Sequence, residues 1–219
     1  MEEPITPVGT KELSQERIDA HYERATTKKW IKKISVQALP RFERHAHKEL
    51  FVKVADVSLD TEMHSKGTKK GTKCRQTLVQ FKPTIAKEKF HAKTEWVYAF
   101  VLNGCVIKMG GTRDGLQGRC GSYLCGHHVQ ERQKSGRCSI TNAFIYNTFV
   151  FYLELGYTIE MFAYALPEHG VTIEVLGETR RITAQTYHAY ESIFLQDFKK
   201  QFGEYPLLSD NCDPKYKTE

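Results

Sequence analysis

Long apolar runs are missing from this chain of 219 residues. Because a transmembrane helix needs about 20 consecutive apolar residues, we expect no membrane span. The first residues also lack the basic and then apolar pattern of a signal peptide. We therefore expect a cytoplasmic protein, whose six cysteines are mostly reduced thiols.

The chain also lacks an internal repeat and the common cofactor-binding motifs. Gly110-Gly111-Thr112 is without the G-x-x-x-x-G-K-[ST] frame of a phosphate-binding loop. One group of thiols and imidazoles has the spacing C-x4-C-x-H-H-x9-C, which fits no common structural zinc site. Its members are Cys120, Cys125, His127, His128 and Cys138. We expect no zinc, and no signature supports a cysteine nucleophile.

Acidic residues are too few to balance the basic ones in the first part of the chain. Residues 1–96 hold 20 Lys and Arg against 13 Asp and Glu, an excess of 7, whereas residues 97–219 hold 12 against 13. Such an asymmetric positive charge suggests a polyanionic partner such as nucleic acid. A basic soluble protein without such a partner is the alternative.

Two segments concentrate this basic excess. Ser14 can cap a helix that runs to about Ile34, and a polar loop without apolar residues spans 64–73. Both could contact the phosphates of double-stranded DNA; a solvated helix face and an ordinary polar loop are the alternatives. The candidate contacts are Lys28, Lys29, Lys32, Lys33, Lys66, Lys69, Lys70 and Lys73.

Residue patterns predict an α+β fold, with a small mixed or antiparallel sheet flanked by helices and a basic N-terminal α/β extension. Apolar runs on both sides of Asn103-Gly104 predict a hairpin with a type I′ turn. The expected strands are 49–58, 75–82, 157–166 and 171–175, and the expected helices are 113–123, 141–155 and 183–202. Thr183 is the predicted N-cap of the last helix, with Gly203 after its end. We expect a DNA-contacting region at 1–94, a core at 95–212 and a flexible tail at 213–219.

The last predicted helix carries a carboxylate in an apolar stripe. Tyr187, Phe194 and Phe198 share one helical face, and Glu191 lies in the middle of that face. A carboxylate there is unfavourable unless it has a partner. An arginine would make Glu191 structural, whereas a divalent cation such as Mg²⁺ would give it a catalytic role.

Taken in order, these residues resemble the GIY-YIG nuclease family over about 95–212. Val97-Tyr98 stands at the first family triplet and matches it in part, and Lys108-Met109-Gly110 stands at the second. Arg119 is nine residues beyond Gly110, at the family's arginine position, and Tyr123 is one helical turn further. The family's glutamate and the Pro…Asn ending of its last helix are matched by Glu191, Pro206 and Asn211.

Lysine at position 108, in place of the second motif tyrosine, is similar to a restriction-enzyme branch of the family. The resemblance implies that Tyr98 is a general base and that Lys108 lowers its pKa. It implies that Arg119 binds the scissile phosphate, that Tyr123 bonds to the phosphate or to the attacking water, and that Glu191 holds Mg²⁺ or Mn²⁺.

The remaining roles follow from the same resemblance. Gly110 and Asn211 are expected to give structural support, and Arg113, His127 and His128 to contact DNA. The implied function is a magnesium-dependent, site-specific DNA endonuclease of the type II restriction kind, acting as a homodimer or higher homo-oligomer. The alternatives are a phage, mobile-element or repair-type nicking nuclease, and a non-catalytic DNA-binding protein with a decayed nuclease fold.

Overall fold

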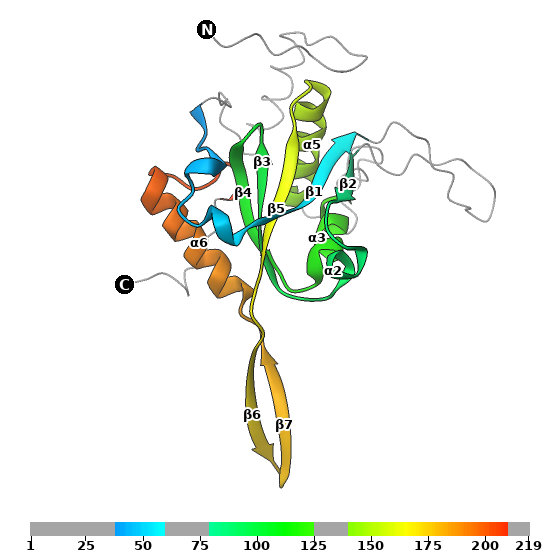
Figure 1. Ribbon diagram of the computed structural model, residues 1–219, viewed down its shortest axis with the longest axis vertical. Helices are drawn as coiled ribbons and strands as arrows, with labels where there is room; N and C mark the ends of the chain where they lie inside the picture. Colours follow the sequence, from blue (N-terminus) through cyan, green and yellow to red (C-terminus); the bar gives the residue numbers. More distant parts are fainter. Residues whose placement is uncertain (1–37, 60–78, 125–139, 210–219) are drawn as a thin grey trace, which may run out of the picture.

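The computed structural model describes residues 38–59, 79–124 and 140–209. Its centre is a five-stranded sheet in the order β2-β1-β5-β3-β4, in which every neighbouring pair is antiparallel. The strands are β1 (Val52–Leu59), β2 (Val79–Pro83), β3 (Trp96–Leu102), β4 (Cys105–Thr112) and β5 (Ile159–Ala165). Helices flank this sheet and a separate two-stranded hairpin extends from it (Figure 1), which confirms the predicted α+β class.

Four α-helices surround the sheet in the described parts of the chain. They are α2 (Lys87–His91), α3 (Gly115–Leu124), α5 (Ile140–Glu154) and α6 (Tyr187–Phe202). Two short 3-10 helices, η2 (Phe42–Arg44) and η3 (Lys48–Leu50), precede β1. None of these helices is both long enough and apolar enough to cross a lipid bilayer.

The β3–β4 hairpin forms as the sequence predicts. Asn103 and Gly104 have φ angles of 45° and 78°, as a type I′ turn requires. Tyr98 is paired with Gly110 across the hairpin, and Phe100 is paired with Lys108, before a bulge shifts the register near the turn. Since β4 is the edge strand of the sheet, its free side is open to the segment that follows α6.

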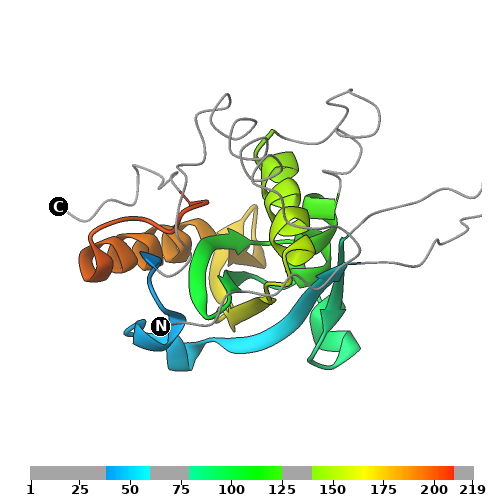
Figure 2. The ribbon, with the colours of Figure 1, turned by 90° about the horizontal axis from the view of Figure 1, so that it is seen from above.

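Two apolar cores lie on opposite faces of the sheet because successive strand residues alternate in direction. Tyr98 and Phe100 belong to the core that contains α3 and α5, whereas Val97 and Ala99 belong to the core that contains α6. Seen from above (Figure 2), β4 lies between α5 and α6. A side chain from α3 and one from α6 can therefore approach the same edge strand from different sides.

The glutamate helix begins later than the sequence predicts. Phe194 and Phe198 are buried on one face of α6, as the stripe predicts. Thr183, however, is not the N-cap, because it lies in the strand β7 (Glu178–Ala184), and Thr186 precedes the first turn instead. Gly203 ends the helix in the left-handed conformation and its N–H bonds to the carbonyl of Lys199, as predicted.

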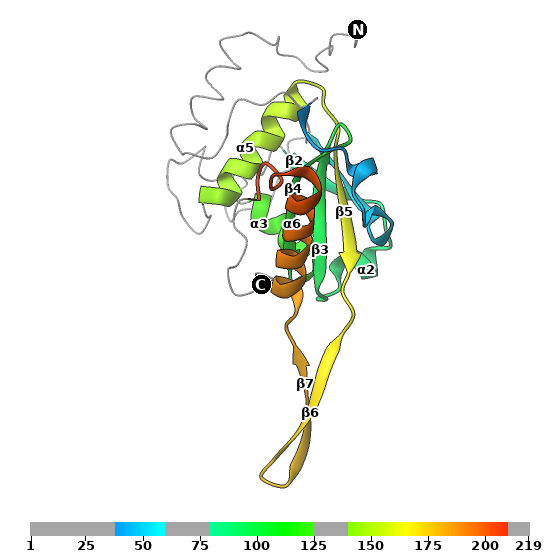
Figure 3. The ribbon, with the colours of Figure 1, turned by 90° about the vertical axis from the view of Figure 1, so that its left-hand side faces the viewer.

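The hairpin of β6 (His169–Val175) and β7 projects away from the body of the molecule as an arm (Figure 3). A strand was predicted at 171–175, but its partner β7 was not. One reason is that the connecting turn is Leu176-Gly177, and leucine at positive φ (52°) is not a residue that signals a type I′ turn.

The sheet extends across the boundary that the sequence suggested near residue 94. β1, from the first part of the chain, pairs with β5 and also with β2, so both strands are part of the same sheet as the β3–β4 hairpin. The predicted helix from Ser14, the loop 64–73, the loop 125–137 and the tail 213–219 lie outside the described residues.

Candidate active site

Arg119 joins two tyrosine hydroxyl groups at one end of the β3–β4 hairpin. Its Nε donates to the Tyr98 hydroxyl at 2.6 Å, and a terminal nitrogen donates to the Tyr123 hydroxyl at 2.9 Å. The two hydroxyls are themselves 2.6 Å apart. Tyr98 comes from β3, whereas Arg119 and Tyr123 are one turn apart on α3, so the helix presents both to the strand. The structure thus brings three of the predicted site residues into one hydrogen-bonded cluster.

A phenolate at Tyr98 would be stabilised by two hydrogen bonds, one from Arg119 and one from Tyr123. The bond between the two hydroxyls can run in either direction, and Arg119 donates to Tyr123 as well. Burial nevertheless raises the pKa of Tyr98 above 10, and the negative charge of Glu191 raises it further, while Arg119 opposes both effects. The pKa of Tyr123 is raised well above 10, again chiefly by burial, so Tyr123 remains a donor.

Access to the cluster is on the side of Arg119. Tyr98 and Tyr123 are fully buried, whereas Arg119 is partly exposed. Burial alone would lower the pKa of Arg119, but the two phenols raise it, and the guanidinium stays charged. A planar cation at the surface of an otherwise apolar site is suited to bind a phosphate group.

Glu191 approaches the same strand from the other face. A methyl group on Gly111 would come within 2.9 Å of a Glu191 carboxylate oxygen, and a methyl group on Gly110 would collide with the hydroxyl of Tyr98. These two glycines are adjacent in β4, so their side-chain directions point to opposite faces. The absence of side chains on the edge strand therefore lets the phenol and the carboxylate approach it together.

The carboxylate of Glu191 fits the ligand role that was predicted for it. Among the residues that the structure describes, it makes no hydrogen bond or ion pair, and no arginine neutralises it. The described residues also contain no group of three or more His, Cys, Asp or Glu able to hold a metal. Mg²⁺ typically takes one or two carboxylates and completes its coordination with water and substrate phosphates, which suits a single carboxylate.

Lys108 has a different neighbour from the one expected. The residue is 7% exposed, and its ammonium group donates to the backbone carbonyl of Leu208 at 3.0 Å. Ser209 bonds to both the N–H and the carbonyl of Met109. Lys108 therefore helps to hold the segment after α6 along the free side of β4. The predicted support residue Asn211 lies outside the described residues.

Lys108 was expected to lower the pKa of Tyr98, but it is not among the groups that shift this pKa in the structure. The pKa of Tyr98 is raised, not lowered, because burial of the phenol outweighs the nearby cation, and that cation is Arg119. In the strand register Lys108 is opposite Phe100, whereas Tyr98 is opposite Gly110. The catalytic roles assigned to Tyr98 and Lys108 stay predictions.

The predicted DNA contacts fall mostly outside the described residues. Among them, Arg113 is described; it is exposed, lies 3.7 Å from Asp114 and bonds to Gln185 at the base of the arm. The eight lysines, His127 and His128 are in the parts that the structure does not describe. Of the thiols and imidazoles considered for zinc, Cys120 is buried against Met161, and burial raises its pKa to about 12.

Glu95 is a site residue that the sequence did not indicate. One of its carboxylate oxygens accepts the N–H and the hydroxyl of Thr186, 2.9 Å away in each case, at the start of the helix that carries Glu191. A negative charge at this end also interacts favourably with the helix dipole. The two residues are 91 positions apart, so no local pattern could have shown their contact.

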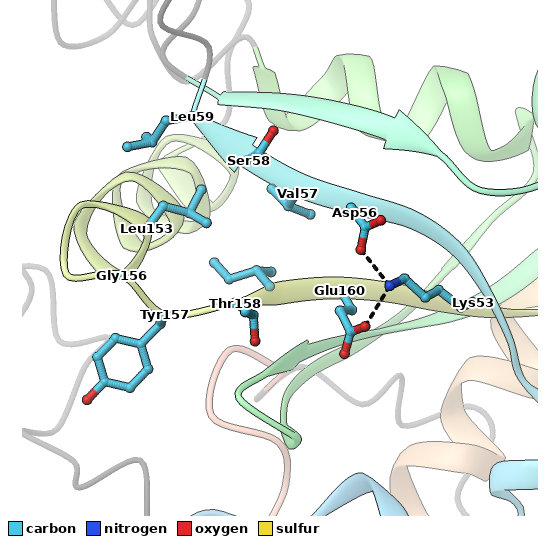
Figure 4. Close-up of a pocket in the computed structure, with 11 residues that line it drawn as sticks. Lys53, Asp56, Val57, Ser58, Leu59, Leu153, Gly156, Tyr157, Thr158 and Glu160 are labelled. Atoms are coloured by element: carbon cyan, nitrogen blue, oxygen red, sulfur yellow. Dashed lines mark hydrogen bonds and ion pairs between the residues drawn. The ribbon is translucent and has the colours of Figure 1, made fainter. Parts of the chain in front are cut away.

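A separate cavity of about 520 Å³ lies beside β1, β5 and the end of α5 (Figure 4). Lys53 there forms ion pairs with Asp56 at 2.6 Å and with Glu160 at 2.7 Å. The lining of this cavity includes none of the residues of the Tyr98–Arg119–Tyr123 cluster or Glu191. The predicted site residues that the structure describes around Arg119 and Glu191 therefore lie at the β4 edge and not in this cavity.

The chain was compared with protein-family models, curated proteins and solved structures, and it matches solved structures. No protein-family model matches the chain, and no curated protein matches it. Restriction endonuclease Hpy188I in complex with product DNA is 21% identical, covering 81% of this chain and 95% of that chain, with a TM-score of 0.46. A mutant of bacteriophage T4 EndoII is 18% identical, covering 75% and 96%, with a TM-score of 0.44. Both structures are similar to this chain at low sequence identity.

Proposed function

We propose that this chain is a DNA endonuclease of the restriction type, which hydrolyses phosphodiester bonds of double-stranded DNA and depends on Mg²⁺ or Mn²⁺. The observation that carries the proposal is the arrangement at β4. A guanidinium bonded to two phenols lies on one face of the strand, and on the other lies a carboxylate that has no hydrogen-bond or ion-pair partner among the described residues. These are the residue types that the cleavage of a phosphodiester needs: a base, a phosphate-binding cation and a metal ligand.

In this proposal Tyr98 accepts a proton from the attacking water. Its phenolate is held by the hydrogen bonds from Arg119 and Tyr123, which remain donors throughout. Arg119 binds the scissile phosphate as negative charge develops on it, because it is the partly exposed member of the cluster. Water and phosphate enter on the Arg119 side, since both phenols are fully buried.

Glu191 would hold the divalent cation, which supplies charge stabilisation at the leaving oxygen and cancels the negative charge that now raises the pKa of Tyr98. Glu95 fixes the first turn of α6 and so positions Glu191. Lys108 and the strand glycines keep the edge of the sheet and the segment after α6 in place. The lysine-rich segments before residue 79 and Arg113 supply further contacts to the DNA backbone, and the protein acts as a homodimer.

The direct test is digestion of a plasmid of known sequence in Mg²⁺, followed by sequencing of the DNA ends. Ends at one fixed sequence support a restriction enzyme. Single-strand nicks at flaps or junctions would instead indicate a repair-type or mobile-element nuclease. Tight DNA binding without cleavage in Mg²⁺ or Mn²⁺ would contradict the catalytic proposal and identify a DNA-binding protein.

A further inference from the structure

The β6–β7 arm exposes large apolar side chains to solvent. Val171 is 56% exposed, Val175 48% and Ile182 45%. Val171 and Ile182 are paired across the two strands, and Val175 is four rungs further out on the same face. A single two-stranded hairpin is marginally stable by itself in water, so this face is suited to be covered by another surface.

The tip of the arm adds an independent observation. Leu176 is completely exposed and has a φ of 52°, a conformation that is uncommon for a bulky residue. Asparagine or glycine would form this two-residue turn with less strain. The turn thus keeps a large apolar side chain at the outermost point of the molecule, where contact with a partner would bury it.

The charge of the arm argues against nucleic acid as the partner. Residues 168–184 contain three glutamates and two arginines, for a net charge of −1. Both strands are acidic next to the apolar tip, at Glu174 and Glu178. A surface that follows the DNA backbone needs an excess of positive charge, which this arm does not have.

Glu178 and Arg180 make the apolar face self-complementary. Glu178 is paired with Val175 and Arg180 with Ile173, so the two charged residues lie two positions apart on one face of β7. Within the arm they form an ion pair. When two arms pack face to face around a two-fold axis between these rungs, Glu178 of each lies opposite Arg180 of the other. Such reciprocal pairing is the mark of an isologous interface.

We infer that the arm is the surface through which two copies of this chain associate, with the apolar tip of each arm packed against the apolar face of the other. The inference specifies the homodimer of the proposed function, but its test needs neither DNA nor cleavage. Seven rungs form a ribbon roughly 24 Å long, and such a ribbon covers less than the roughly 800 Å² per partner of a typical stable interface. The dimer is therefore expected to dissociate reversibly on dilution.

The arm is also connected to the candidate active site. His169 at its base stacks on Tyr190 of α6 and bonds to its hydroxyl at 3.1 Å, one residue from Glu191. The last strand of the arm leads into α6 within a few residues. Association through the arms would thus fix the position of the two glutamate helices relative to each other.

Sedimentation velocity of the full chain, without DNA or Mg²⁺ and over a wide range of concentration, tests this inference. The wild type is expected to pass from monomer to dimer as concentration rises. Replacing Val171 and Ile182 by Thr and Leu176 by Asn should raise the dissociation constant at least tenfold. Thr keeps the strand propensity and Asn suits the turn, so the arm stays folded. A monomeric wild type, or a variant with unchanged association, overturns the inference.

A charge-exchange experiment separates contacts between chains from contacts within one arm. Glu178→Arg and Arg180→Glu each place like charges together, and each variant alone should be monomeric. A mixture of the two variants should form a heterodimer, since four charges then attract across the interface. Glu174→Lys makes a similar charge change on the opposite face of the arm and should leave association unchanged. Absence of the heterodimer overturns the inference.

Discussion

The hydroxyl of Tyr98 and the carboxylate of Glu191 lie against neighbouring glycines of one strand, Gly110 and Gly111, from opposite faces. This relationship explains why a buried phenol and a helix carboxylate, 93 positions apart in the chain (191 − 98), act on each other electrostatically. It also makes the two glycines part of the site, because any side chain on either of them would separate the groups.

Gly111→Ala tests this packing. The new methyl group would approach the Tyr187 ring at 2.8 Å and its backbone carbonyl at 3.1 Å, so the first turn of α6 would have to move. We expect a loss of about 1–3 kcal/mol in the free energy of unfolding by urea, together with reduced cleavage. Gly121→Ala in α3 is the matched control, because nothing lies within 4 Å of its new methyl group. Equal stability of the two variants would contradict the account.

Arg119→Lys tests the bidentate role of the guanidinium. Lysine keeps the charge but cannot donate to both phenols with the geometry of the guanidinium fork. We expect kcat/KM for DNA cleavage to fall about 100- to 1,000-fold, as when one preorganised donor to a developing negative charge is lost. Arg113→Lys is the control and should reduce kcat/KM far less. Near-wild-type cleavage by Arg119→Lys would exclude the proposed role of this residue.

The dependence of cleavage on pH tests Tyr98 as the base. Because its pKa is raised above 10, the phenol is protonated at neutral pH and the reactive phenolate fraction increases with pH. The single-turnover rate should thus rise about tenfold per pH unit below that pKa. Tyr98→Phe should lose this dependence and about 100- to 10,000-fold of the rate. A rate that stays flat or falls between pH 7 and 9 in the wild type would argue for another base.

Stability at mildly acidic pH should depend on His45. Burial lowers the pKa of this imidazole, His47 lowers it further, and Asp197 and Glu49 act in the opposite direction. Since the folded-state pKa is lower than the unfolded value of about 6.5, the stabilisation is complete above the unfolded pKa and is lost as pH falls through the folded pKa.

Replacement of His45 by Phe removes the titrating group while keeping a ring against Phe198, on which His45 now stacks. Urea unfolding at pH 7.5 and pH 5 should then show a smaller decrease in stability than in the wild type. His91→Gln, at an exposed position, serves as the control. An unchanged decrease in the His45→Phe variant would show that other groups cause the pH dependence.

Local patterns predicted the parts of the fold whose signals are local. The Asn103-Gly104 turn and the buried face of α6 follow from residues a few positions apart. The hairpin of β7 was missed because the Leu176-Gly177 turn is an unusual one, and Thr183 was accordingly misread as a helix cap.

Contacts between distant segments could not be derived in this way. Lys108 donates to the carbonyl of Leu208, a contact without a local signal because 100 positions separate the two residues. Glu95 likewise bonds to Thr186 at the start of α6, 91 positions away. Burial, the largest cause of the raised pKa of Tyr98, depends on how α3 packs on the sheet and so has no local signal in the sequence.

The central claim is that Glu191 holds the cation that DNA cleavage needs, and single-turnover cleavage of plasmid DNA in Mg²⁺ tests it most directly. The wild type should cut, and Glu191→Gln should lose at least 1,000-fold of the rate, a loss of about 4 kcal/mol in transition-state stabilisation. Glu204→Gln, at an exposed position just beyond the same helix, should cut like the wild type. Full activity of Glu191→Gln, or no cleavage by the wild type in either Mg²⁺ or Mn²⁺, would contradict the account.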